Sequence, residues 1–167
     1  MFTEIQQPGY LHVIFNHIPI IGTAMGAFAL VIAMCFRHRS ALITALAVIL
    51  VSGIAAYPVY KTGEAAYKPI RKIADDSGVD WLDEHMDRAD RWTWVYYVMA
   101  VIAIAAIIVP VKWPGASLPL AATTLIVAIS TLAAGAYIAQ AGGRVRHSEF
   151  RPLDNMINAP PTPDHQH

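Results

Sequence analysis

Four stretches of the chain are apolar enough to cross a membrane as helices. They cover about residues 11–36, 41–60, 93–112 and 118–141. Residues 41–56, 95–111 and 118–141 carry no charge, and each of these runs approaches or exceeds the ~20 residues that span a ~30 Å hydrocarbon core. The pattern predicts an all-α, polytopic membrane protein built as a four-transmembrane-helix bundle.

The polar segment 61–92, between the second and third spans, has a helical pattern of its own. Trp81, His85, Ala89 and Trp92 recur at helical spacing, and the aspartates lie between them. This spacing predicts an amphipathic loop helix over about 79–92 that turns His85 inward. The sequence Ser77 to Asp80 resembles a capping box, which predicts the helix start.

Glycine and proline predict where the helices bend and end. Pro19 predicts a kink in the first span. The aromatic belt at 57–60, which contains Pro58, predicts the end of the second span, and Gly142 with Gly143 predict a break after the fourth. We expect one transmembrane domain over 1–150 and a flexible, proline-rich tail over 151–167. No internal sequence repeat is evident, although a 2+2 arrangement of helices is compatible with the pattern.

Composition supports a membrane protein and excludes several kinds of site. The chain is 56% hydrophobic and 14% charged, whereas soluble domains carry about 25% charged residues. Cys35 is the single cysteine, which excludes an internal disulfide and the covalent attachment of c-type haem. The first positive residue is Arg37, so no cleavable signal peptide is expected. Mixed charge gives no case for nucleic acid, and no motif indicates an independent enzyme.

Four spans place both termini and the 61–92 loop on one side of the membrane. The opposite short loops contain Arg37, Arg39 and Lys112 and no acid. The side with the termini holds the remaining nine Lys and Arg residues and all twelve acids. A strict count of Lys and Arg would put that larger side in the cytoplasm. The purely basic short loops favour the reverse orientation.

Histidines and glutamates gather at the span ends on the side of the termini. Imidazole and carboxylate groups are costly at a membrane boundary and are natural ligands of a metal or a haem. The candidates are His12, His17, Glu64, Glu84, His85, His147 and Glu149. Asn16 shares a helix face with His12, but His17 lies on another face. We expect one of these two histidines to ligate and the other to bond a neighbouring group or a cofactor carboxylate.

Three motifs resemble those of an uncharacterised family of small bacterial four-helix membrane proteins. They are HxxxNHxPxxG at 12–22, TGExA at 62–66 and GGxxRHxE at 142–149. That family is similar in layout to predicted haem-b-binding membrane proteins. The resemblance implies a bacterial inner-membrane location and a functional set made of His12, Asn16, His17, Glu64, His85, His147 and Glu149.

Three hypotheses remain open at this point. The first is a haem b electron-transfer subunit of a larger respiratory or redox complex. Its preferred axial pair is His17 with His147, its second pair is His12 with His85, and Arg144 and Arg146 bind the propionates. The second is a non-haem iron, copper or zinc site made of histidines and glutamates. The third is a structural subunit without a cofactor. The histidine side is expected to face the periplasm and its redox partners.

Overall fold

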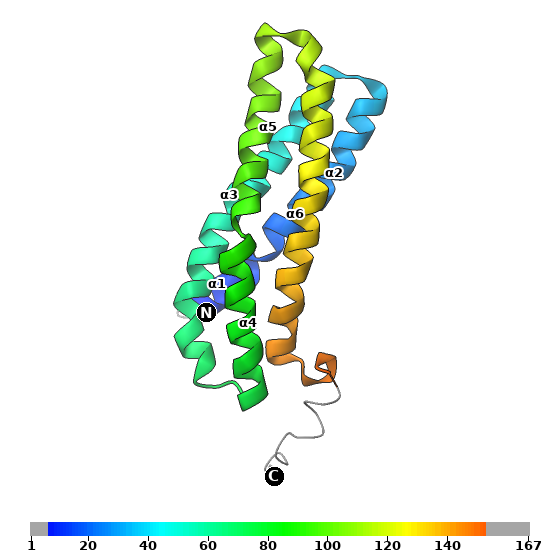
Figure 1. Ribbon diagram of the computed structural model, residues 1–167. Coiled ribbons are helices and arrows are strands. Elements are labelled where there is room, and N and C mark those ends of the chain that lie inside the picture. Colours follow the sequence, from blue (N-terminus) through cyan, green and yellow to red (C-terminus); the bar gives the residue numbers. More distant parts are fainter. Residues whose placement is uncertain (1–6, 153–167) are drawn as a thin grey trace.

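The computed structural model describes residues 7–152, which form four long rods joined by short turns (Figure 1). Two of the rods are each made of two consecutive helices. The helices are α1 (Pro8–Phe15) with α2 (His17–Phe36), α3 (Arg39–Arg71), α4 (Asp76–Trp92) with α5 (Trp94–Lys112), and α6 (Ser117–Arg146). Two short 3-10 helices, η1 (Pro114–Ala116) and η2 (Ser148–Phe150), flank α6. The predicted all-α four-helix bundle is confirmed.

All four rods are long and apolar enough to cross a membrane. Large apolar side chains cover their outer surface; Phe28, Val101 and Ile126, for example, are each about two-thirds exposed. Such a surface suits lipid rather than water. The protein is therefore a multi-pass membrane protein. The amphipathic helix α4 lies at the end of the bundle that holds α1 and the last turns of α6 (Figure 1).

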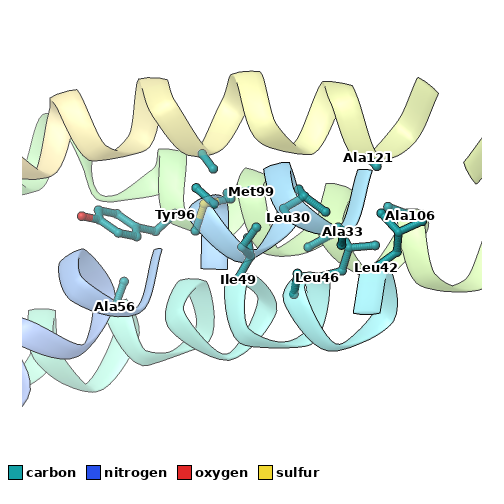
Figure 2. Packing of buried hydrophobic residues seen from close by; sticks show 14 residues of the cluster. Leu30, Ala33, Leu42, Leu46, Ile49, Ala56, Tyr96, Met99, Ala106 and Ala121 are labelled. Atoms are coloured by element: carbon teal, nitrogen blue, oxygen red, sulfur yellow. The ribbon is translucent and has the colours of Figure 1, made fainter. Parts of the chain in front are cut away.

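Small residues bring the helices close together in the core of the bundle. Leu30, Ile49 and Met99 are fully buried there (Figure 2). A Cβ on Gly26 would lie 2.7 Å from Ile49 Cγ1, which only a glycine avoids. Close approach of this kind is the usual basis of helix packing in membranes, where water does not drive association.

The second and fourth rods extend past their predicted ends. Helix α3 continues through Gly63 to Arg71, and α6 continues through Gly142 and Gly143 to Arg146. A glycine inside a helix costs about 1 kcal/mol relative to alanine. At Gly63 and Gly142, a histidine ring from another helix packs in the space of the missing side chain. Tertiary packing therefore outweighs the local preference to end the helix.

The first rod breaks at Asn16 and not at Pro19. Pro19 lies in the first turn of α2, where backbone N–H groups have no partner inside the helix. Because Pro19 has no N–H to donate to the Phe15 carbonyl, the helix breaks within the turn before it, so the predicted bend is present and lies at Asn16. A corresponding break at Thr93 separates α4 from α5.

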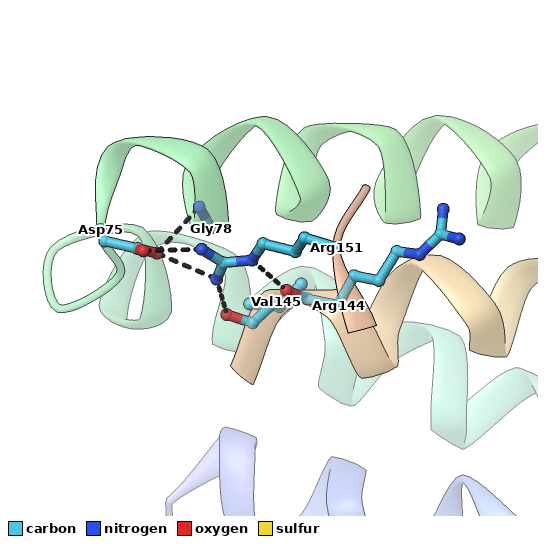
Figure 3. Close-up of polar contacts among 5 residues, drawn as sticks. All are labelled: Asp75, Gly78, Arg144, Val145 and Arg151. Atoms are coloured by element: carbon cyan, nitrogen blue, oxygen red, sulfur yellow. Dashed lines mark hydrogen bonds and ion pairs between the residues drawn. The ribbon is translucent and has the colours of Figure 1, made fainter. Parts of the chain in front are cut away.

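Helix α4 begins three residues before its predicted start, and Asp75 caps it instead of Ser77. The Asp75 carboxylate accepts a hydrogen bond from the Gly78 N–H at 2.9 Å. It also accepts from the Arg151 guanidinium at 2.6 Å, as Figure 3 shows. Arg151 is only 8% exposed and also donates to the Val145 carbonyl at 2.9 Å. Arg151 thus belongs to the fold and not to the predicted flexible tail, of which 153–167 lie outside the described residues.

The chain is built from two similar halves, α1–α3 and α4–α6. In each half a short helix leads through a break into a membrane span, and the short helix packs against the end of the returning helix. The buried positions of the returning helices repeat with one spacing: Ala45, Ile49, Ser52, Ala56 and Ala66 in α3, and Thr124, Ala128, Thr131, Gly135 and Val145 in α6. Each half therefore contributes an equivalent wall to the interior.

Candidate functional site

His12, on α1, is held against α3 by one hydrogen bond and one glycine. Its Nδ1 lies 3.0 Å from the Val59 carbonyl oxygen, and a carbonyl can only accept, so Nδ1 carries the proton. The ring lies over Gly63, where a Cβ would be 3.0 Å from Cε1 and 3.1 Å from Nδ1. The glycine thus makes room for the imidazole one helical turn beyond the carbonyl that it binds.

His85, on α4, is held against α6 in the same way. Its Nδ1 donates to the Ile138 carbonyl oxygen at 2.9 Å. The ring lies over Gly142, where a Cβ would be 3.0 Å from both Cε1 and Nδ1. Again the glycine follows the carbonyl by one helical turn. Because the two arrangements are equivalent, the two halves of the chain present their histidines in matching ways.

The two imidazoles lie close together at the junction of the halves. Their ring centroids are 6.2 Å apart and their planes meet at 79°. With Nδ1 engaged in both rings, Nε2 is the nitrogen left for a ligand. Two imidazoles bound on opposite sides of one metal ion have centroids about 6.3 Å apart, given a metal–nitrogen bond of about 2.0 Å, whereas tetrahedral ligation brings them to about 5 Å. The centroid distance of 6.2 Å is closer to the first of these values than to the second.

Both histidines line a cavity of about 220 Å³. Most of its wall is apolar, and Ala56, Ala89 and Gly135 are among its small residues. Polar groups also line it: Asn16, His17, Thr93 and Tyr96. The Oδ1 atom of Asn16 is buried and has no hydrogen-bond partner in the described structure. A largely apolar cavity with a few convergent polar groups is the usual form of a cofactor or ligand site.

One edge of the cavity is bridged and another is open. The Tyr60 hydroxyl of α3 donates to Asp90 of α4 at 2.7 Å, which links the two helices beside the histidines. Ala139 is the α6 counterpart of Tyr60, and it cannot form such a bridge. Ala139 and His17 both line the cavity and are both exposed. Part of the cavity wall is therefore formed by residues that are also exposed on the outside of the bundle.

The structure does not bring the predicted pair His17 and His147 together. His17 lines the cavity, and its Nδ1 donates to the Val13 carbonyl of its own rod at 3.2 Å. His147 follows the last residue of α6, is exposed, and contacts Glu149 at 3.0 Å. The predicted break at Gly142 and Gly143, which would have turned His147 back over the bundle, is helical. His12 and His85 form the pair instead.

The candidate carboxylates and arginines lie away from the histidine pair. Glu64 pairs with Lys61 at 2.7 Å, Glu84 pairs with Arg88 at 2.6 Å, and Glu149 contacts His147. The pKa of Glu149 is lowered by its own backbone N–H and then by His147. The Arg144 guanidinium lies over the Trp81 ring, 4.4 Å from its centroid, and Arg146 is exposed. Neither arginine lines the cavity.

Between residues 7 and 152, no three His, Cys, Asp or Glu side chains cluster as they would to hold a metal ion. The predicted mixed histidine–glutamate site is therefore not assembled there. What this part of the chain does assemble is a pair of imidazoles. Two imidazoles are all the ligands that a protein supplies to a bis-histidine haem, because the other ligands of the iron come from the macrocycle.

The residues that hold the rings are those that sequence reasoning missed. The sequence pattern places Val59 and Ile138 inside the second and fourth spans and Gly63 and Gly142 just beyond them, and it assigns none of the four to the site. An aliphatic residue one turn before a glycine occurs at both places, but it also occurs at 18–22, 49–53 and 111–115, so this pattern alone does not single out the two sites. No family model, no curated protein and no solved structure matches the chain.

Proposed function

We propose that the chain is a haem b electron-transfer subunit embedded in a membrane, with one haem held between His12 and His85. The observation that carries the proposal is the geometry of this pair: ring centroids 6.2 Å apart, with both Nδ1 atoms tied to backbone carbonyls. A hydrogen bond at Nδ1 fixes the tautomer and makes Nε2 a better metal ligand. In both rings, the orientation and the tautomer with a proton on Nδ1 are thus fixed before any ligand binds.

The surroundings of the pair also suit a flat macrocycle. Ala56 and its α6 counterpart Gly135 are small, and both line the cavity between the halves. Apolar walls exclude water, which is one of the factors that set a haem potential. When bound, haem would supply a one-electron iron couple. The protein's part is to supply two axial nitrogens, keep water away and fix the plane of each imidazole.

The location of the pair limits how electrons can pass. His12 is on α1 and His85 on α4, and both helices lie at the end of the bundle that holds the last turns of α6 (Figure 1), so one haem there cannot connect both membrane surfaces. We propose exchange between a quinone in the membrane and another membrane or periplasmic redox subunit. The purely basic short loops at the opposite end support placing the histidine end in the periplasm of a bacterial inner membrane.

A reduced-minus-oxidised visible spectrum of the detergent-purified protein tests the proposal, with metal analysis of the same sample. We expect a Soret shift and a sharp α band, both lost in His12→Ala and in His85→Ala. His147→Ala is the matched control, because this histidine lies outside the cavity, and it should keep the spectrum. A featureless spectrum with stoichiometric iron, copper or zinc would replace haem by a non-haem metal. If the protein showed neither a haem spectrum nor bound metal, the remaining interpretation would be a structural subunit without a cofactor.

A further inference from the structure

Asn16 gives one side of the cavity a polar group that the other half of the chain lacks. It lies four residues after His12, and Ala89 lies four residues after His85, so each shares a helix face with its histidine. Both Asn16 and Ala89 line the cavity, but a methyl group forms no hydrogen bond. The two sides of the cavity therefore differ, and a polar ligand is held better on the side of Asn16.

The free side-chain atoms on this side are hydrogen-bond acceptors. Oδ1 of Asn16 is buried and has no partner among residues 7–152. His17 donates from Nδ1 to the Val13 carbonyl at 3.2 Å, so in the neutral ring Nε2 carries a lone pair and accepts. No Lys or Arg of the described residues lines the cavity. Since a buried acceptor without a partner is costly, the complementary ligand is a neutral hydrogen-bond donor and not an anion.

The rest of this side is apolar and belongs partly to the outer surface of the bundle. Pro19, Ile20 and Ile21 follow His17 on α2 and line the cavity. Ile21 is 54% exposed, and His17 and Ala139 are exposed as well. Because α2 belongs to a membrane-spanning rod, the exposed side chain of Ile21 faces lipid. The ligand that suits this side has an apolar body, carries a hydrogen-bond donor and dissolves in the bilayer.

We infer that Asn16 and His17 bind a quinol, the reduced form of a membrane quinone, an inference that rests on the proposed function. The hydroxyl groups of a quinol donate hydrogen bonds, whereas the carbonyl oxygens of the oxidised quinone only accept. Oδ1 of Asn16 and Nε2 of His17 can therefore bond the quinol and not the quinone. The cavity thus distinguishes two molecules that share one ring, and the form that it binds for the proposed exchange in the membrane is the reduced one.

The experiment compares the reduced and oxidised forms of short-tailed ubiquinone and menaquinone. Each form is titrated into the detergent-purified protein by anaerobic calorimetry at about pH 8, where free imidazole is neutral. For at least one of the two headgroups, the wild type should bind the quinol about tenfold more tightly than its quinone, the weight of one hydrogen bond to an otherwise unpaired acceptor.

Two substitutions remove the acceptors at similar side-chain size, Asn16→Leu and His17→Phe. Each should lower the affinity for the quinol and leave the affinity for the quinone unchanged, a split that a damaged fold would not produce. His17→Gln keeps an acceptor oxygen and should retain part of the preference. His38→Ala is the matched control, because His38 lies in the short turn at the far end of the bundle, and it should bind both forms as the wild type does.

Equal affinity for the reduced and oxidised forms of both headgroups would overturn the inference, and so would a preference that survives both the Asn16 and the His17 substitutions. The visible spectrum judges the haem proposal separately. A haem spectrum without a quinol preference would leave the haem proposal intact and overturn this inference alone. A quinol preference in a protein that holds neither haem nor metal would overturn the haem proposal and keep the quinol site.

Discussion

At the scale of single residues, the histidine rings are fixed by glycines that have no room for a side chain. A Cβ on Gly142 would lie 3.0 Å from His85 Cε1, closer than ordinary van der Waals contact. Gly142→Ala should therefore displace the imidazole and weaken its bond to the Ile138 carbonyl. Disturbing a group that orients a metal ligand typically costs 10- to 100-fold in affinity. We expect a loss of about tenfold or more in haem affinity, measured by Soret titration.

Gly143→Ala is a closely matched control for Gly142→Ala. Gly143 is the next residue of the same helix, and nothing lies within 4 Å of the position its Cβ would take. Alanine at an unstrained helical site stabilises by about 0.4–1 kcal/mol, since it restricts the unfolded chain. Gly143→Ala should raise the melting temperature and leave haem affinity unchanged. If both substitutions lowered affinity equally, the contact with His85 would not be what Gly142 provides.

At the scale of elements, the end of the chain is tied to the start of α4 by Asp75 and Arg151. The guanidinium holds the pKa of the Asp75 carboxyl below its ordinary value of 3.8. A group whose pKa is lowered by folding stabilises the protein above its unfolded pKa, and this stability is lost as pH falls through the folded pKa. The tie should therefore be complete at neutral pH and should fail below about pH 3.8.

Asp75→Asn tests this tie, because asparagine still caps a helix but carries no charge. The Asp75 side chain is 61% exposed, so solvent screens the pair and the expected cost is about 0.5–1 kcal/mol at pH 7. Thermal unfolding followed by tryptophan fluorescence should show a lower melting temperature for the variant at pH 7. The difference should shrink as the pH approaches 3. A difference that is constant with pH would mean that charge is not its source.

Helix existence could be predicted from the sequence, whereas helix ends could not. The charge-free runs are long enough that only spanning helices satisfy their backbone in lipid. Helices α3 and α6 continue through Gly63 and Gly142, where histidines from other helices pack, and no local pattern reveals those contacts. His85 was correctly expected to turn inward, because the period of α4 places it opposite the aspartates. Its partner His12 was also expected, as the second pair beside His17 with His147, and the structure brings these two rings together.

At the scale of the whole molecule, the repeat explains why one site arises from two distant segments. Each half contributes one histidine, one carbonyl and one glycine to the site, and only the packed pair of halves brings the two histidines together. The similarity of the two halves is not evident from the sequence, because equivalent buried positions hold different residues, such as Ile49 in α3 and Ala128 in α6. Burial repeats although residue identity does not. Function in this chain is thus a property of the assembled halves.

The orientation of the whole molecule decides which partners can reach the site, and it can be measured with single cysteines. In a Cys35→Ser background, Glu149→Cys marks the histidine end and Ser40→Cys marks the opposite end; both native side chains are exposed. We expect a membrane-impermeant maleimide, applied to cells whose outer membrane alone is opened, to label the cysteine at 149. The cysteine at 40 should react only after the inner membrane is also opened, since purely basic loops stay in the cytoplasm. The reverse labelling would place the histidine pair in the cytoplasm and require a soluble cytoplasmic redox partner.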